Sequence, residues 1–121
     1  MFAAVVVVTV GPGLSYSPNP VAVNVGDSVQ WNWAGALHSS TSSASSTLEV
    51  WDSGAKSTGS FTHTFTRAGT FAYFCTVHGT VMSGSVQVSA PVTTNVPAMS
   101  PRALVLLAAA LALIGAMLIR R

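Results

Sequence analysis

The only cysteine of the chain lies in the stretch C-T-V-H-G-T-V-M, Cys75 to Met82, together with a histidine and a methionine. A lone thiol beside an imidazole and a thioether fits three kinds of chemistry. It is a buried structural cysteine, a nucleophile activated by the histidine, or a ligand for a soft metal ion. One cysteine forms no disulfide within the chain, so the choice lies among these three.

The spacing of the donor residues favours the metal ion. Cys75, His78 and Met82 form a C-x2-H-x3-M pattern between two predicted strands, and a loop of this length turns three side chains toward one point. His38 follows an upstream strand that ends at Trp33, and loops at one end of a β-sandwich cluster. The four residues supply one thiolate, two imidazoles and one thioether, which is the ligand set of a blue-copper site. Hard cations prefer oxygen ligands and fit badly.

The other two readings of Cys75 are weaker. A catalytic cysteine needs an orienting third group and an oxyanion hole, and neither signature is present, so we expect no enzymatic activity and no small-molecule substrate. A lone cysteine is usually inert packing, but the nearby histidines and methionine argue against that role. His63 lies between Phe61 and Phe65 on one face of a predicted strand, which indicates a structural or surface histidine rather than a ligand.

Short segments of alternating hydrophobicity predict the strands that position these residues. The last such segment before the thiol places Phe71, Tyr73 and Cys75 on one face. No helical periodicity occurs before residue 103, and turn signals separate the segments, so the pattern predicts an all-β, Greek-key β-sandwich or barrel. The Ser-rich stretch 38–47 is predicted to be a flexible surface loop. The predicted strands lie within residues 5–10, 21–25, 28–33, 61–66, 71–75 and 84–88.

Composition excludes two further classes of protein. Hydrophobic residues make up 50% of the chain and charged residues only 7%, so the chain is too apolar to be disordered. The formal net charge of +2 is concentrated in the C-terminal tail, which carries three arginines. Residues 1–90 hold two basic and three acidic residues, a net charge of −1. Without a basic stripe, this region is not expected to bind nucleic acid.

The C-terminus predicts a membrane anchor. Ala103–Ile119 is an uncharged, almost wholly apolar run rich in Ala and Leu, and Arg120 and Arg121 close it. Such a run indicates a short transmembrane helix, and the arginine pair favours the cytoplasmic side, which places the rest of the chain outside the cytoplasm. The predicted organisation is a copper-binding domain over residues 1–90, a linker over 91–102 and the apolar helix over 103–121.

The stretch V-P-A-M-S-P-R, Val96 to Arg102, refines this prediction. Followed by the apolar run and the arginine pair, it resembles the exosortase-type C-terminal sorting tails of Gram-negative bacteria, particularly the IPTL type. Pro97 and Ser100 match that motif, whereas Pro101-Arg102 replaces the acidic and aromatic pair that often follows. The resemblance implies cleavage and transfer to the cell surface, and the alternative is a plain membrane anchor. Met1–Val10 lacks the features of a secretory signal, so an exported protein would need one that this sequence does not show.

A second resemblance covers the β-rich part of the chain. The stretch F-T-H-T-F-T-R-A-G-T-F-A-Y-F-C-T-V-H-G-T-V-M-S-G-S-V-Q-V, Phe61 to Val88, is similar to the last two strands and the ligand loop of plastocyanin/azurin-type cupredoxins. Ser17–Trp33 and Trp51–Gly54 also match the family pattern. The resemblance implies a cupredoxin fold that binds one copper ion. It further implies the ligand set, with equatorial His38, Cys75 and His78 and axial Met82.

The same resemblance implies a function and shows one departure. Members of the family carry single electrons, bind both histidines through Nδ1 and pass electrons to transient redox partners through an exposed histidine, here His78. Ser39 stands where the family usually has an asparagine that ties two ligand loops together, and its hydroxyl is expected to reach Thr76 instead. A surface protein that binds or sequesters copper and a structural surface module on the same scaffold remain alternatives to an electron carrier.

Overall fold

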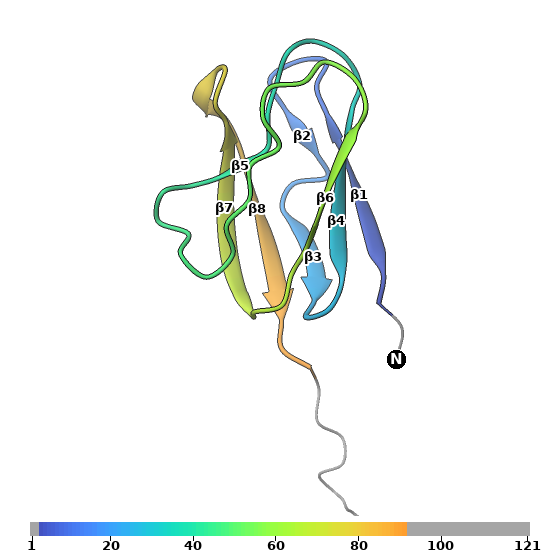
Figure 1. Ribbon diagram of the computed structural model, residues 1–121, viewed down its shortest axis with the longest axis vertical. Helices are drawn as coiled ribbons and strands as arrows, with labels where there is room; N and C mark the ends of the chain where they lie inside the picture. The colour runs from blue at the N-terminus through green and yellow to red at the C-terminus, as the bar shows by residue number, and fades with distance from the viewer. Residues whose placement is uncertain (1–2, 92–121) are drawn as a thin grey trace, which may run out of the picture. The chain divides into compact units, whose positions relative to one another are not determined.

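The computed structural model describes residues 3–91, and these residues form two packed β-sheets (Figure 1). One sheet has the strand order β2-β1-β4-β6 and the other the order β3-β8-β7-β5. The predicted all-β sandwich is therefore confirmed for this part of the chain. The strands are β1 (Val5–Val10), β2 (Tyr16–Ser17), β3 (Val21–Asn24), β4 (Ser28–Trp33), β5 (Thr41–Ser42), β6 (Ser60–Thr64), β7 (Gly69–Cys75) and β8 (Gly79–Ser89).

Strand pairing brings the ends of β4 and β7 to one end of the sandwich. β1 runs parallel to β4 from Val5↔Ser28 to Val10↔Trp33, and β7 pairs with β8 in antiparallel fashion. In Figure 1 β1 starts at the bottom, and the segments that follow β4 and β7 lie at the top. This arrangement gathers the β1–β2, β4–β5 and β7–β8 connections at that end, where Lys56 of the β5–β6 connection also pairs with His38.

The core is filled by the alternating faces that the sequence predicts. Trp31 is fully buried on β4, and Tyr73 and Cys75 are buried on β7. Trp31 stacks on Trp51 with ring centroids 5.6 Å apart and meets the edge of Tyr73 at 5.3 Å. Aromatic pairs at such separations add to the free energy gained from burial, so they stiffen the sheets beneath the loop end.

The Ser-rich stretch differs from the prediction of a flexible surface loop. Ser39 and Ser40 are fully buried, and the stretch contains strand β5, which pairs with β7. The Ser40 amide donates to Ser53 Oγ (2.8 Å), and Ser40 Oγ accepts from Trp51 Nε1 (3.0 Å). These hydrogen bonds satisfy polar groups that would otherwise oppose burial, so the first half of the stretch is part of the core.

The last strand is longer than the sequence pattern indicates. It starts at Gly79, whereas alternation predicted it only from residue 84. The register shifts between Phe74, which pairs with Ser83, and Cys75, which pairs with Gly79. Residues 80–82 are therefore an excess on β8, and such irregularities often re-aim side chains at functional sites.

The predicted linker beyond Pro91, the sorting motif and the apolar helix over 103–121 lie outside the described residues. Among residues 3–91, no helix is long and apolar enough to cross a membrane.

Candidate metal centre

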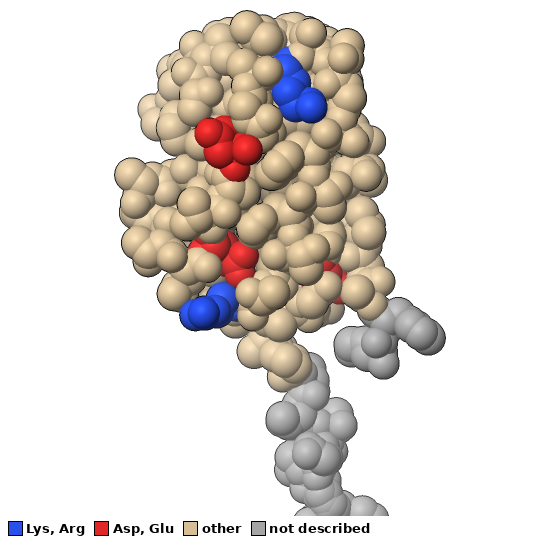
Figure 2. Space-filling view, viewed as in Figure 1, with Lys and Arg blue, Asp and Glu red and all other residues tan. Residues whose placement is uncertain are grey.

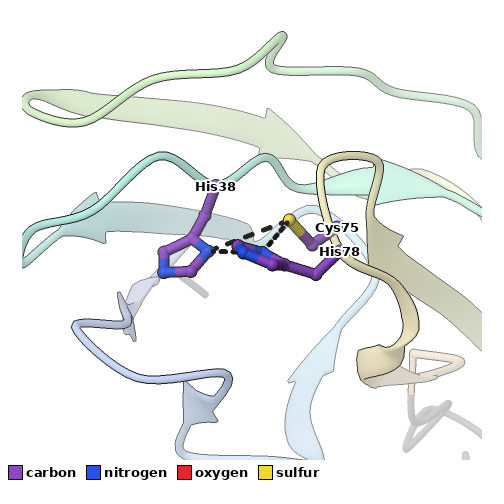
Figure 3. A group of neighbouring side chains, drawn as sticks. All are labelled: His38, Cys75 and His78. Atoms are coloured by element: carbon purple, nitrogen blue, oxygen red, sulfur yellow. Dashed lines mark hydrogen bonds between the residues drawn. The ribbon is translucent and has the colours of Figure 1, made fainter.

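Three of the four predicted ligands meet at the loop end of the sandwich. His38 comes from the segment after β4, Cys75 from the end of β7 and His78 from the turn that follows. Figure 3 shows their side chains pointing toward one another. Nδ1 of His38 lies 3.3 Å from Nδ1 of His78 and 3.9 Å from the Cys75 sulfur, and that sulfur lies 3.5 Å from Nδ1 of His78.

These separations fit one shared metal ion. Metal–nitrogen bonds of about 2.0 Å and metal–sulfur bonds of about 2.3 Å to a first-row ion place such donors roughly 3.3–3.8 Å apart. The observed separations span 3.3 to 3.9 Å. The donor set contains a thiol and imidazoles and no carboxylate, which favours a soft or borderline ion.

Local structure explains why Cys75 and His78 face the same point. Cys75 is the last residue of β7 and follows Phe71 and Tyr73 on the inner face, which buries its side chain completely. His78 lies three residues later, within the turn before β8, and its side chain is exposed. The centre therefore has a closed side formed by the core and one imidazole edge open to solvent.

His38 is fixed by backbone contacts on both sides. Its amide donates to the Lys56 carbonyl (3.0 Å) and its carbonyl accepts from the Lys56 amide (2.8 Å). The same carbonyl also accepts from Trp33 Nε1 at 2.9 Å. On the ring, Nε2 lies 3.5 Å from the Pro12 carbonyl, so a proton on Nε2 leaves the Nδ1 lone pair directed at the thiol and the second imidazole.

Gly11 makes room for this imidazole. A Cβ on Gly11 would lie 2.9 Å from His38 Nε2 and 2.9 Å from its Cδ2. Gly11 also has φ +72°, a left-handed conformation that residues with side chains rarely adopt. The turn Gly11-Pro12-Gly13 that follows β1 thus forms one wall of the centre.

Met82 is fully buried in the core that also contains Cys75. It is the last residue of the excess segment 80–82, between the turn of His78 and the pair Phe74↔Ser83. A buried thioether at this point of β8 agrees with the predicted axial position, and its ligation stays a prediction.

Ser39 links the two segments that carry the ligands, as the sequence predicted. Its hydroxyl lies 3.0 Å from Thr76 Oγ1 and accepts from the Thr76 amide at 2.9 Å. Its own amide donates to the Cys75 sulfur at 3.4 Å. An N–H directed at the sulfur stabilises a thiolate, and hydrogen bonds of this kind tune a metal–thiolate bond.

Two buried tyrosines lie beneath the centre as neutral phenols. Burial, with smaller contributions from Cys75 and Tyr73, raises the pKa of Tyr16 far above its ordinary value. Burial likewise raises the pKa of Tyr73 to about 12. Tyr16 donates its hydroxyl proton to the Ser39 carbonyl at 2.5 Å, so it supports the segment next to His38 without adding a charge.

His63 lies outside this group, and sequence reasoning missed its partner. Its Nε2 donates to the Glu49 carboxylate at 2.7 Å, and its ring packs on Trp51 with centroids 5.1 Å apart. Glu49 is 4% exposed and also accepts from the amides of Thr66 (2.8 Å) and Arg67 (2.9 Å). The signal available in the sequence was a lone acidic residue inside the apolar stretch L-E-V-W.

Exposed apolar side chains precede both histidines of the centre. Leu37 is 51% exposed just before His38, and Val77 is 42% exposed just before His78. Val81, near the start of β8, is 72% exposed. These three side chains therefore give the loop end of the sandwich exposed apolar surface. Figure 2 shows few charged side chains on the face that it draws.

Comparison with known proteins gives a family for the fold and the site. A family model described as copper binding proteins, plastocyanin/azurin family, matches residues 3–89. No curated protein matches the chain.

Several solved structures are similar to this chain. An amicyanin mutant in the Cu(I) state has a TM-score of 0.61 and 28% sequence identity, over 70% of this chain and 82% of that chain. A purple cupredoxin from Nitrosopumilus maritimus has a TM-score of 0.58 and 23% identity, over 69% and 99%.

A copper-containing nitrite reductase from Thermus scotoductus has a TM-score of 0.62 and 20% identity, over 72% of this chain. The match spans only 23% of the reductase chain, so the likeness shows a shared fold rather than a shared activity.

Proposed function

Because the chain belongs to the plastocyanin/azurin family of copper binding proteins, we propose that it is a type 1 copper protein that carries one electron at a time. His38, Cys75 and His78 would hold the copper ion in this proposal, and the Met82 thioether would be a weaker fourth ligand. The observation that carries it is the meeting of a thiol and two imidazole Nδ1 atoms within 3.9 Å of one another.

Bound copper would supply reversible exchange of one electron between Cu(I) and Cu(II). The chain supplies a rigid set of ligands, because backbone hydrogen bonds hold His38 and burial holds Cys75. The Ser39 amide stabilises negative charge on the sulfur. Ligands that move little between the two oxidation states keep the reorganisation energy low, which makes electron transfer fast.

The exposed edge of His78 is the proposed port for electrons, because it is the ligand that reaches solvent. The surrounding apolar side chains, Leu37, Val77 and Val81, would meet redox partner proteins. A small contact of this kind dissociates quickly, as a carrier requires. We also propose that the protein catalyses no reaction and takes no small-molecule substrate.

We further propose that the protein works outside the cytoplasm, at the periplasmic face or the cell surface. The support comes from sequence alone: the apolar run Ala103–Ile119, the arginine pair after it and the sorting-type motif at Val96–Ser100. In this proposal the protein is either anchored in the membrane by this run or processed by a sorting enzyme.

Titration of the full-length protein with Cu(II), followed by visible absorption, tests the copper site. We expect an intense blue thiolate-to-copper band at one equivalent, lost in Cys75→Ser. A colourless complex, or a weak band that Cys75→Ser leaves unchanged, would contradict the proposal.

Voltammetry and competition with Cu(I) and Cu(II) chelators then distinguish a carrier from a sequestering protein. A carrier shows a reversible one-electron wave and retains copper in both oxidation states. Rapid loss of copper from either state would favour sequestration instead.

A further inference from the structure

A chain of hydrogen bonds runs from the ligand loop to a carboxylate on the surface. The Thr76 hydroxyl lies 3.0 Å from Ser39 Oγ, which lies 2.8 Å from Thr41 Oγ1. Thr41 Oγ1 lies 2.9 Å from Oδ1 of Asp52, an exposed residue. Asp52 touches no ligand, yet this chain connects it to the residue after Cys75.

The direction of every hydrogen bond in this chain follows from the carboxylate. A carboxylate oxygen only accepts, so the single hydroxyl proton of Thr41 points to Asp52. The Thr41 oxygen then accepts the hydroxyl proton of Ser39. Ser39 Oγ is left with two lone pairs, and the amide and hydroxyl of Thr76 donate to them. Each hydroxyl in the chain therefore has one defined orientation.

The two ends of this ordered segment are neighbours of the ligands. Ser39 follows His38, and Thr76 follows Cys75. The bonds between Ser39 and Thr76 therefore tie together the two backbone segments whose side chains converge on the metal centre. If Ser39 Oγ turned its proton toward Thr76, it would lose an acceptor site for the Thr76 amide or hydroxyl.

We propose that Asp52 is a positioning residue of the metal centre. By accepting from Thr41, it sets the direction of the hydroxyl chain and so fixes the link between the His38 and Cys75 segments. The role rests on the proposed copper site, because its consequence is the geometry of those ligands.

Four variants separate this role from a general effect on folding. Thr41 and the Gly54 amide both donate to Oδ1 of Asp52, at 2.9 Å each, so Asp52→Asn keeps the acceptor oxygen but removes its charge, and the neutral oxygen holds the Thr41 proton more weakly. Thr41→Val removes the central hydroxyl, and Thr41→Ser retains it. Asp27→Asn makes the same charge change at a carboxylate that accepts from the amides of Ala4 and Asn24 instead.

The first measurement uses the metal-free, full-length protein and follows amide hydrogen exchange of Thr76 by NMR. A net hydrogen bond contributes about 0.5–1.5 kcal/mol, so we expect Thr76 to exchange on the order of threefold to tenfold faster in Asp52→Asn and Thr41→Val. In Thr41→Ser and Asp27→Asn the Thr76 exchange rate should stay near that of the wild type. The exchange rates of buried β4 amides serve as the reference that corrects each variant for a change in global stability. An unchanged Thr76 amide in Asp52→Asn would overturn the proposal.

The second measurement uses the copper-loaded proteins. We expect a shift in the thiolate-to-copper band and in the reduction potential for Asp52→Asn and Thr41→Val, with Thr41→Ser restoring both. A wild-type band that Asp52→Asn leaves unmoved would overturn the positioning role alone. A wild-type protein without such a band would overturn the proposed function, and the positioning role with it.

Discussion

His38 and His63 both lie on inward-facing positions of the sandwich, but the structure gives them opposite partners. His38 directs Nδ1 toward the thiol of Cys75 and the imidazole of His78. His63 donates Nε2 to the Glu49 carboxylate at 2.7 Å and packs against Phe65 with centroids 4.7 Å apart. A histidine whose nitrogen meets other metal donors can share an ion with them, whereas one bonded to a carboxylate and stacked on aromatic rings holds structure together.

The two histidines also differ in whether a carboxylate lies beside them. Within the described residues, no carboxylate joins the His38 group, so its electron-pair donors face one another. At Glu49, burial alone raises the pKa, but hydrogen bonds from His63, Thr66 and Arg67 outweigh it and hold that pKa below its ordinary value. The first region is arranged to gain a cation, and the second already satisfies a buried anion.

The largest difference should appear when a histidine is removed from each region. His78→Ala should abolish the blue thiolate-to-copper band, because one equatorial ligand is lost while the exposed position keeps the fold intact. His63→Ala should keep the band and lower the free energy of unfolding by about 1.5–3 kcal/mol, the contribution of a hydrogen bond to a charged group. Visible absorption and urea unfolding of both variants measure these effects. Loss of the band in His63→Ala would contradict the assignment of His63 as a structural residue.

Removing the carboxylate should destabilise the fold without changing the metal centre. Glu49→Ala leaves the amides of Thr66 and Arg67 and the ring of His63 without an acceptor, so we expect a loss of about 2–4 kcal/mol. Glu49→Gln keeps one acceptor oxygen and should lose less. Denaturant unfolding of the metal-free proteins gives both values. Equal stability of Glu49→Ala and wild type would mean that these hydrogen bonds contribute nothing.

Lowering the pH should remove the contribution of Glu49 to the stability of the fold. The pKa of Glu49 is lowered in the folded protein, so the unfolded chain binds the proton more tightly and this carboxylate stabilises the fold fully above its ordinary pKa of 4.5. That contribution is lost as the pH falls from about 4.5 through the lower folded pKa. Unfolding free energies of wild type and Glu49→Gln should therefore converge toward low pH. A difference that stays constant from pH 7 to pH 3 would contradict this assignment.

A pair of glycines tests the wall beside His38. Gly11 and Gly54 have φ of +72° and +75°, so alanine at either position should cost about 1–2 kcal/mol of backbone strain. Only at Gly11 does the added Cβ approach His38, and at Gly54 it meets nothing within 4 Å. We expect Gly11→Ala to weaken copper binding on the order of tenfold or more and Gly54→Ala to leave it unchanged. Chelator competition measures the copper affinity of both variants. Equal affinities would mean that Gly11 does not shape the metal centre.

The smallest change is expected at Met82. Leucine has a similar volume, so Met82→Leu should change the free energy of unfolding by less than about 1.5 kcal/mol. Loss of a weak axial thioether disfavours Cu(II) and should raise the reduction potential while the blue band remains. Voltammetry and unfolding of the variant measure the two effects, and an unchanged potential would place Met82 in the core only.

Sequence patterns predicted the sheets and the meeting of the donors because both depend on local periodicity and loop position. Alternation placed Tyr73 and Cys75 on an inner face, and the C-x2-H spacing placed His78 in the following turn. The predicted reach of Ser39 to Thr76 is confirmed. The reading of His63 as structural agrees with its contacts.

Long-range hydrogen bonds account for what the sequence did not show. The burial of Ser39 and Ser40 depends on partners 11 to 37 residues away, and composition alone indicated a flexible loop. Glu49 gathers donors from a strand and a turn that begin more than ten residues later. Gly11 approaches His38 only because β1 runs parallel to β4, and no local pattern records that contact.

The central claim is that one copper ion is bound by the Cys75 thiolate and by the imidazoles of His38 and His78, but not by that of His63. Continuous-wave and pulsed EPR of the Cu(II)-loaded, full-length protein test this most directly, with His63→Ala as the control. The account predicts narrow copper hyperfine splitting and two coordinated imidazole nitrogens, in the wild type and in His63→Ala alike. A wide, tetragonal splitting, or a count of imidazoles that falls in His63→Ala, would contradict it.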